Sequence, residues 1–245
     1  MTEGKDLVFI GDAHLEALDE PCRDFIAFLG RLEQTAQRIV LMGDLFNLWL
    51  GLRELEHPYQ TAVVQKLAEL RRHGVVVRYL EGNRDYRIGA AYAGFAVDDA
   101  NEGGIVERFA GHKLFAVHGD LANLADRQYR RWRRLSRSAV VWRLFNLLPR
   151  RRRRRLAEAL EGRMRSTNLD FKQVFPETAV RAYAAPYLEA SHDAVILGHF
   201  HVEQDLLVDA GARPRRILVL PEWKENRRHL RVGAAGEVEF VDSVY

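Results

Sequence analysis

The sequence predicts an α/β protein in which two β-sheets pack together and are flanked by helices, with a helical hairpin inserted near mid-chain. Three observations lead to this prediction. Short runs rich in β-branched residues alternate with helical patterns through the first 200 residues. After residue 200 the pattern changes to short strands and turns with no helix. Residues 121–168 interrupt the alternation with a strongly basic stretch of helical periodicity.

Five strand-like runs are short, apolar and bounded by glycine. They cover residues 6–12, 38–44, 75–83, 113–120 and 194–199. Helical patterns occupy roughly 22–37, 58–73 and 176–190, and Pro176 suits the first position of the last helix. Further short strands are predicted at 95–100, 104–111, 215–221, 229–233 and 237–243. Because each sheet must bury an apolar face, two sheets covered by helices are the expected layering.

The inserted segment is predicted to be a basic helical hairpin. Residues 121–149 have the pattern of one long helix that Pro149 ends, and a second helix of about 150–166 begins with six arginines. Residues 121–165 hold 15 Arg and only three acidic residues, whereas the whole chain has a net charge of only +3. The expected organisation is a single domain of residues 1–245 that carries the hairpin, residues 121–168, as an insertion.

Composition excludes several classes of protein. A single cysteine, Cys22, leaves no room for a disulfide framework or a cysteine-based zinc site. No stretch approaches the roughly 18 apolar residues of a membrane span. The first apolar run, residues 7–10, is too short for a signal peptide. With 47% hydrophobic and 29% charged residues, the chain is expected to be a globular protein of the cytoplasm.

Each of the five strands ends in a polar cluster of the kind that binds metals. The clusters are Asp12-x-His14, Gly43-Asp44, Gly82-Asn83, His118-Gly119-Asp120 and Gly198-His199-x-His201. Loops beyond the carboxyl ends of strands in such a sheet converge on one crevice. Seven imidazole, carboxylate and amide ligands are too many for one ion, but they suit two first-row divalent ions that share a carboxylate. One such residue alone would more simply be a cap or a turn residue, so the series of five carries the prediction.

In order and spacing, these clusters resemble the motifs of the calcineurin-like metallophosphoesterases over residues 9–201. The resemblance implies a two-sheet sandwich flanked by helices. It also implies one ion held by Asp12, His14, Asp44 and His201, and a second held by Asp44, Asn83, His118 and His199, with Asp44 bridging. Catalytic roles would fall to Arg84, His118 and His199.

Arg84 follows Asn83 directly, in the stretch EGNRDY. Many members of the superfamily have a His at this position, usually assigned to protonate or polarise the leaving oxygen. Arginine does not deprotonate at working pH, so Arg84 cannot be a general acid. A pyrophosphate expels a phosphate group with a pKa of about 6, which needs charge stabilisation rather than a proton. Arg84 therefore favours a pyrophosphate substrate; the alternative is that Arg84 only pairs with Asp85 or Glu81.

Within the superfamily, GNRDY resembles one subgroup, the UDP-2,3-diacylglucosamine diphosphatases of the lipid A pathway. The segments MGDLFNLW, VHGDLANLADRQYRRWRRLSRS and LPEWKENRRHLRV also resemble this subgroup. The resemblance implies two Mn²⁺ ions, although another divalent metal is possible. It implies cleavage of the substrate to UMP and 2,3-diacylglucosamine 1-phosphate, and a lid at 121–168 that shelters the acyl chains. Substrate contacts would come from Asn83, Arg84, Asp126, Ser166, Asn168, Lys172 and His199.

Three interpretations of the basic hairpin remain open. It can be a solvated helical surface packed on the body through its aromatic residues. It can be an interfacial element that binds an anionic membrane surface, where each basic residue contributes about 1 kcal/mol. It can also bind nucleic acid through interleaved Arg, Trp and Tyr, which would indicate a nucleic-acid-directed phosphodiesterase. Arg84 favours a nucleotide-lipid diphosphate over nucleic acid, so the expected location is peripheral, on the cytoplasmic face of the inner membrane.

Overall fold

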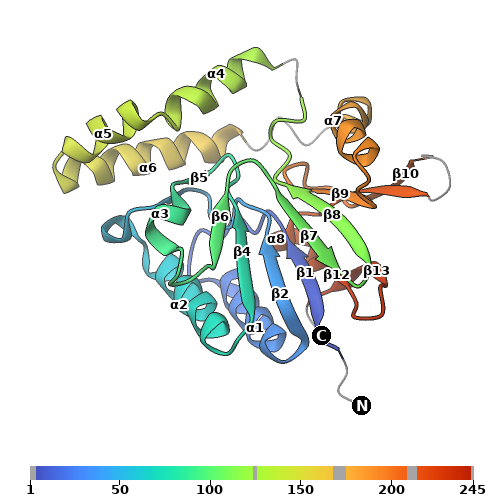
Figure 1. Cartoon of the computed structure of the whole chain (residues 1–245). Coiled ribbons are helices and arrows are strands. Elements are labelled where there is room, and N and C mark those ends of the chain that lie inside the picture. Colours follow the sequence, from blue (N-terminus) through green and yellow to red (C-terminus); the bar gives the residue numbers. More distant parts are fainter. Residues whose placement is uncertain (1–3, 124–125, 168–174, 209–213, 244–245) are drawn as a thin grey trace.

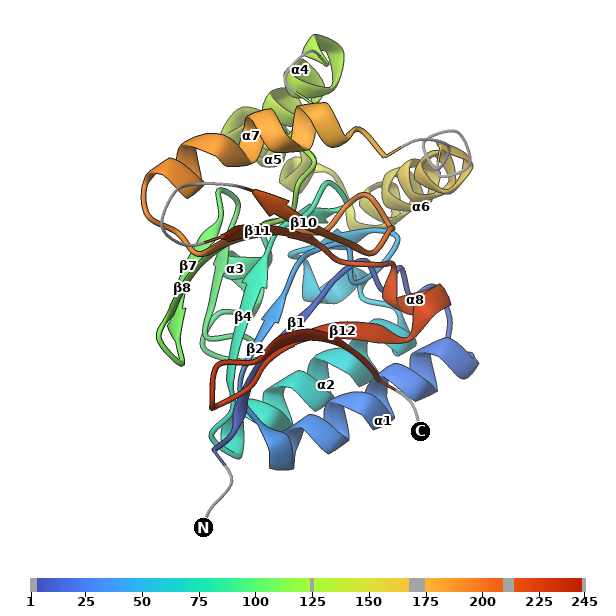
Figure 2. The same cartoon turned by 90° about the vertical axis from the view of Figure 1, so that its right-hand side faces the viewer.

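The computed structural model describes residues 4–123, 126–167, 175–208 and 214–243. Two β-sheets pack face to face with helices on both outer faces, and three further helices lie over one end (Figures 1 and 2). The six-stranded sheet has the order β13 (Val238–Asp242), β12 (Arg228–Val232), β1 (Asp6–Ile10), β2 (Ala36–Leu41), β4 (Val76–Leu80) and β6 (Asp99–Asn101).

The five-stranded sheet has the order β10 (Gln204–Val208), β11 (Arg215–Val219), β9 (Ala194–Leu197), β8 (His112–Val117) and β7 (Ile105–Phe109). A small third sheet pairs β3 (Trp49–Leu50) with β5 (Asp85–Tyr86). The central strands β1, β2 and β4 of the first sheet pair in parallel, as do β8 and β9 of the second. Their carboxyl ends lie at the end that the three extra helices cover (Figure 1). The two-sheet sandwich predicted from the sequence is confirmed.

The side chains of β1 alternate between two apolar layers. Leu7 and Phe9 point into the layer between the sheets, whereas Val8 and Ile10 point toward α1 (Glu20–Thr35) and α2 (Pro58–Arg72). A third apolar layer joins the outer face of the second sheet to α7 (Glu177–Glu189). Both faces of the central strands are therefore buried, which explains why their sequences are apolar runs rather than alternating ones.

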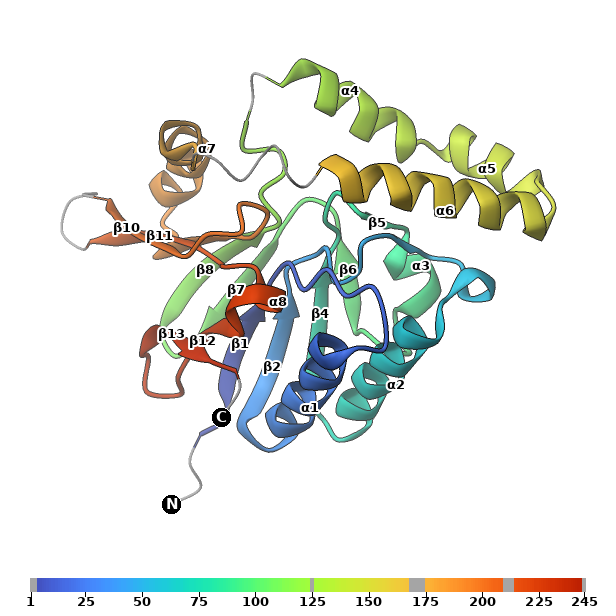
Figure 3. The ribbon, with the colours of Figure 1, turned by 180° about the vertical axis from the view of Figure 1, so that it is seen from behind.

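The predicted long helix over 121–149 is wrong. The insertion instead forms α4 (Arg127–Ser136), α5 (Ala139–Leu147) and α6 (Arg150–Thr167). Ser138 leaves the helical conformation with ψ 142°, and its hydroxyl accepts a hydrogen bond from the Val141 amide at 3.3 Å. A serine in this role begins a new helix, and the chain turns there because its side chain competes for backbone donors. The first arm of the predicted hairpin is thus divided into α4 and α5, and α6 runs back beside them (Figure 3).

The other predicted helices lie within two residues of their expected bounds, and Pro176 is the N-cap of α7 rather than its first residue. The expectation of no helix after residue 200 is wrong, because α8 (Trp223–Asn226) makes a single turn there. A four-residue helix has no periodicity that a sequence pattern could reveal. The sequence also did not predict α3 (Ile88–Tyr92), the 3₁₀ turn Arg53–Leu55, β3, β5 or β10. Within the described ranges, no helix combines the length and apolarity needed to cross a bilayer.

Candidate metal centre

The loops that follow β1, β2, β4, β8 and β9 meet beneath the inserted helices (Figures 1 and 3). One group of predicted ligands comes from the first and last of these loops. The Nε2 atoms of His14 and His201 lie 3.1 Å apart. Asp12 Oδ1 is 3.8 Å from His14 Nε2 and 3.7 Å from His201 Nε2. The structure therefore brings Asp12, His14 and His201 to one point, although the first lies 189 residues from the last.

A second group lies beside the first and centres on Asn83. Its side-chain oxygen is 3.1 Å from His118 Nε2 and 3.0 Å from His199 Nδ1. Asp44 Oδ1 is 3.8 Å from His118 Nε2. Ligand atoms of Asp12, Asp44 and His118 lie within 4.8 Å of one another, so the two groups are continuous. All seven predicted ligands thus line a single buried site.

The donor atoms fit divalent ions. Two imidazole nitrogens that each bind a common ion at about 2.1 Å, roughly at right angles, would lie about 3 Å apart, as those of His14 and His201 do. Asp12 Oδ1 is buried and has no hydrogen-bond partner within the described residues. A buried carboxylate oxygen left in this way is costly unless a cation completes its surroundings. Residues Asp12, His14, Asp44 and His201 would hold one ion, and Asp44, Asn83, His118 and His199 the other.

The backbone is strained at the predicted ligands. Nine non-glycine residues of the described chain have positive φ, and five of them are predicted ligands, namely Asp12, His14, Asp44, His199 and His201. Left-handed conformations cost about 1–3 kcal/mol each in non-glycine residues. Strain of this kind persists where a site requires it, so its concentration here supports a functional centre.

Gly43 and Gly82 allow two of the loops to approach each other. A Cβ atom on Gly82 would lie 2.2 Å from Asp44 Oδ1, and one on Gly43 would lie 2.6 Å from the Gly82 nitrogen. Gly43 also has φ +92°, a conformation that disfavours side chains. The glycines that precede Asp44 and Asn83 are therefore required by packing as well as by turn geometry.

Burial and mutual repulsion shift the pKa values of the site. Burial raises the pKa of Asp12 to about 6. Burial, with the neighbouring His118, lowers the pKa of His199 to about 3. Burial opposes the charge on His118, yet the carboxylates of Asp44, Asp12 and Asp120 raise its pKa to about 9. Divalent ions would relieve these conflicts, because they favour an ionised carboxylate and neutral imidazoles.

Asp85 and Glu81, the two acidic residues of the EGNRDY stretch, are not predicted ligands, but they accept hydrogen bonds that hold the loops of the site. Asp85 is fully buried, and its Oδ2 accepts hydrogen bonds from the amides of Asp44 and Gly82, both at 2.8 Å, and from the Tyr79 hydroxyl at 2.9 Å. Glu81 accepts from the Ile88 amide at 2.7 Å at the start of α3. Asp85 therefore joins the loops after β2 and β4. Its place two residues after Asn83 was visible in the sequence, but its partners were not.

Two further carboxylates hold ligand-bearing loops. Glu222 Oε2 lies 3.2 Å from Nδ1 of His201, which directs Nε2 toward Asp12. Asp120, two residues after His118, accepts from the hydroxyl of Tyr129 and from Arg133 Nε at 2.7 Å. Both of these last partners lie in α4, so the insertion is anchored directly to the end of the His-Gly-Asp motif.

Arg84 is buried against Asp44. Its Nε lies 3.5 Å from Asp44 Oδ2, Nη1 donates to the Asn47 carbonyl at 3.3 Å, and Nη2 donates to the Met164 carbonyl of α6 at 3.2 Å. Only 4% of the residue is exposed. The sequence left open that Arg84 only pairs with Asp85 or Glu81. In the structure, the carboxylates of Asp85 and Glu81 bind the other groups described above, and Arg84 lies against Asp44.

The remaining predicted substrate contacts lie in or near the insertion. Asp126 is the N-cap of α4, and its Oδ1 accepts from the Tyr129 amide at 2.8 Å. Ser166 belongs to the last turn of α6. Asn168 and Lys172 lie outside the described residues.

Comparisons with known proteins agree with this geometry. The calcineurin-like phosphoesterase family model matches residues 6–203. The chain is 28% identical over 240 residues to UDP-2,3-diacylglucosamine hydrolase of Yersinia enterocolitica, covering 96% of this chain and 97% of that protein. It is 29% identical over 232 residues to the protein of that name from Shewanella oneidensis, covering 94% of each.

Among solved structures, an archaeal phosphodiesterase is similar with a TM-score of 0.48 at 10% identity, over 96% of this chain and 98% of that one. The family match extends from β1, which precedes the first predicted ligand, past His201, the last. It therefore includes every loop of the site described above. With its two-sheet fold and this series of ligand-bearing loops, the chain belongs to the calcineurin-like phosphoesterase family and is a metallophosphoesterase.

Proposed function

We propose that this chain hydrolyses the pyrophosphate bond of UDP-2,3-diacylglucosamine, releasing UMP and 2,3-diacylglucosamine 1-phosphate. The names of relatives that match more than nine-tenths of the chain support this substrate. The observation that carries the proposal is the burial of Arg84 against Asp44, at the position where a proton donor would serve a phosphodiesterase.

The chemistry of Arg84 matches a diphosphate. Its guanidinium lies 3.5 Å from the predicted bridging carboxylate. An arginine side chain is a poor proton donor and a strong partner for phosphate oxygens. It cannot protonate an alkoxide, but it can stabilise negative charge on a departing phosphate group. An alkyl phosphodiester would gain less from such a group than a pyrophosphate does.

Two divalent ions, with Mn²⁺ as the expected metal, would stabilise charge on the phosphoryl group under attack. Hydrogen bonds to the backbone hold the predicted ligands in place: the Met42 carbonyl accepts a hydrogen bond from Nδ1 of His118 at 2.7 Å. This contact leaves Nε2 of His118 directed toward Asn83. The Asp12 carboxylate accepts from the His199 amide at 2.8 Å, which joins the loops of both predicted ion sites.

The chain would form a single domain with the insertion as its lid. The lid would bind the acyl chains of the substrate. Its underside contains an apolar cluster of Trp142 with Leu48 and Tyr86 of the body. Partly buried Phe145, Leu160 and Met164 surround that cluster. Asp126, Ser166, Asn168 and Lys172 remain proposed substrate contacts, together with Asn83, Arg84 and His199.

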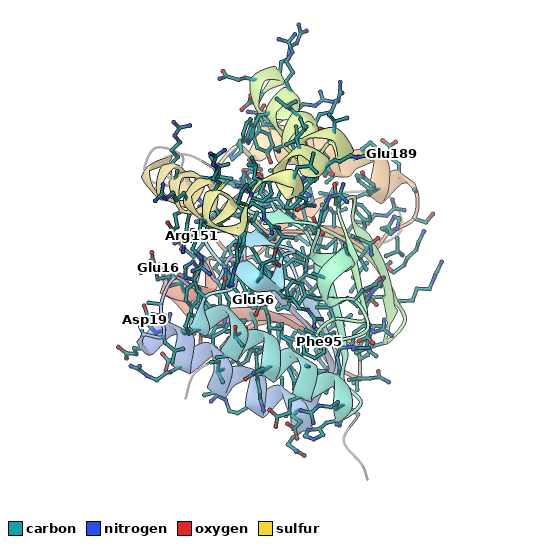
Figure 4. All side chains as sticks on the ribbon, turned by 90° about the vertical axis from the view of Figure 1, so that its left-hand side faces the viewer. Glu16, Asp19, Glu56, Phe95, Arg151 and Glu189 are labelled. Carbon is teal, nitrogen blue, oxygen red and sulfur yellow. The ribbon has the colours of Figure 1, made fainter. Side chains whose placement is uncertain are left out.

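The outer face of the insertion would bind an anionic membrane. Of eleven large apolar side chains that are exposed in the described chain, six belong to α4–α6, namely Trp132, Leu135, Val140, Leu144, Leu147 and Leu156. Side chains with nitrogen tips project outward from the same helices, among them Arg151 of α6 (Figure 4). Exposed apolar groups beside arginines suit an interface of acyl chains and anionic headgroups. This supports a peripheral location on the cytoplasmic face of the inner membrane.

The second candidate is a phosphodiesterase that acts on nucleic acid through the basic insertion. Arginines with Trp132 and Tyr129 on α4 are the feature that favours it. Salt alone should release a nucleic-acid binder, whereas a lipid enzyme should need detergent micelles for activity. Another alternative, closer to the first proposal, is a metallophosphoesterase that cleaves a different nucleotide-lipid diphosphate.

The proposal is tested by product analysis after incubation with Mn²⁺ and UDP-2,3-diacylglucosamine, and by the Asp44→Ala variant. UMP and the lipid 1-phosphate should form, and Asp44→Ala should abolish turnover while the circular dichroism spectrum is unchanged. A substitution at the site removes little apolar core, so the fold should persist. Turnover of Asp44→Ala near that of the wild type would refute a bridging role for Asp44. A wild-type protein that cleaves a nucleic-acid diester but not this substrate would favour the second candidate.

A further inference from the structure

Arg137 belongs to the insertion, yet its side chain reaches into the metal-binding loop of the body. It is the C-cap of α4 and precedes Ser138, the N-cap of α5. Only 9% of its side chain is exposed, whereas most arginines of the insertion face solvent. The turn between the two helices therefore places one arginine inside the molecule.

The guanidinium of Arg137 binds both ends of the turn that carries Asn83 and Arg84. One nitrogen, Nη2, donates to the carbonyl of Gly82 at 2.5 Å and to the carbonyl of Asp85 at 2.8 Å. These two carbonyls bracket Asn83 and Arg84 in the chain. The two N–H bonds of Nη2 lie in the guanidinium plane and point in fixed directions, so this nitrogen sets the separation of the two carbonyls.

Two carboxylates and an aromatic ring hold Arg137 in this position. Its Nη1 donates to Glu81 Oε2 at 3.0 Å and lies 3.4 Å from Glu102 Oε2. Its guanidinium carbon lies 5.2 Å from the centre of the Tyr86 ring. Burying an arginine is unfavourable unless its donors are paired. Removing it would take from Glu81 its cationic partner and leave the carboxylate with backbone amides such as that of Ile88.

We propose that Arg137 is a positioning residue that holds the 82–85 turn in its metal-binding conformation, so that docking of the insertion and assembly of the metal centre depend on each other. The inference rests on the proposed metal centre, since Asn83 is expected to bind one of the ions. Coupling between two sites is reciprocal. Metal binding should therefore also stabilise the junction between α4 and α5.

The test measures Mn²⁺ affinity by isothermal titration calorimetry, with no substrate present. Arg137→Ala should weaken binding by about 10–100-fold, the loss typical of removing a group that orients a ligand. Arg137→Lys should regain much of the melting temperature through Glu81, but not the affinity, because an ammonium cannot bridge both carbonyls in the same geometry. Arg134→Ala is the matched control: it removes one exposed arginine of the same helix and should bind Mn²⁺ like the wild type.

Hydrogen exchange gives a second readout. Mn²⁺ should slow amide exchange over 127–147 in the wild type but not in Arg137→Ala. Mn²⁺ affinity of Arg137→Ala or Arg137→Lys within twofold of the wild type would overturn the inference, even if either variant melts at a lower temperature. A wild-type protein that does not bind Mn²⁺ at all would instead refute the proposed metal centre.

Discussion

Arg84 contacts both the predicted metal centre and the insertion, through Asp44 on one side and the Met164 carbonyl on the other. Its backbone amide also donates to Asp44 Oδ1 at 2.9 Å. A substitution of the side chain would keep that backbone contact. The effect of losing the guanidinium can therefore be separated from loss of the aspartate's position.

Arg84→Ala should lower kcat/KM on a nucleotide-lipid diphosphate by about 10²–10³-fold, the cost of losing one preorganised donor. Arg84→Lys should recover only part, because a point charge cannot bind in bidentate fashion. Arg84→His should improve on Arg84→Ala for an alkyl phosphodiester that needs a proton donor, and remain poor on the diphosphate. Bound metal should be measured in each variant as the control. If Arg84→Ala cleaves both substrates like the wild type, the guanidinium has no role in charge stabilisation.

The sequence allowed the candidate metal ligands to be predicted because these residues directly follow the ends of strands. It did not allow the residues that hold them to be predicted. Glu222, the N-cap of α8, contacts the imidazole of His201, and Asp120 binds Arg133 of the insertion. Such pairs depend on which loops are neighbours in space, and a single sequence does not contain that information.

Among the helices, α5 has one apolar face buried against the body and another exposed to solvent. Trp142 is buried and its ring centroid lies 6.2 Å from that of Tyr86, whereas Leu144 and Leu147 are 60% and 76% exposed. The sequence showed only that this stretch is apolar on nearly all sides. The break at Ser138 is what turns one apolar face toward the body and leaves the other uncovered.

Replacing Leu144 and Leu147 together with Ser should weaken binding to vesicles that contain anionic lipid by tenfold or more. Burying one leucine in an apolar phase contributes about 1.5–3 kcal/mol, so two account for such a loss. Vesicle sedimentation would measure it, with hydrolysis of a soluble chromogenic diester as a check on the site. Leu207→Ser is the matched control, because Leu207 is 66% exposed but lies on β10, away from the insertion. Unchanged sedimentation of the double variant would rule out this face as the membrane contact.

In the whole molecule, the C-terminal strands complete the first sheet. β12 pairs antiparallel with β1, the first strand of the chain, and β13 forms the edge beyond it (Figure 3). The strands could be predicted from their apolar runs, but their order could not, because the pairing of β1 with β12 joins residues more than 200 positions apart. His229 lies in this closing strand, with Nδ1 2.8 Å from the Ser243 hydroxyl and its ring 4.9 Å from that of Phe28.

His229 should make the stability of the fold depend on pH. Burial, followed by Arg231 and Arg228, lowers the pKa of His229 from 6.5 to about 4, and Asp242 offsets this only in part. The folded state therefore favours the neutral ring, so its contribution is complete above pH 6.5 and declines as pH falls toward 4. The loss at pH 5 is on the order of 2 kcal/mol.

Urea unfolding at pH 7 and pH 5, with a chelator present, would measure this loss. His229→Gln cannot titrate, and its side chain can still bond Ser243, so the variant should lose less stability than the wild type between the two pH values. Other buried groups titrate in both proteins and cancel in the comparison. Equal losses in the two proteins would show that His229 is not the group responsible, and that closure of the first sheet is indifferent to pH in this range.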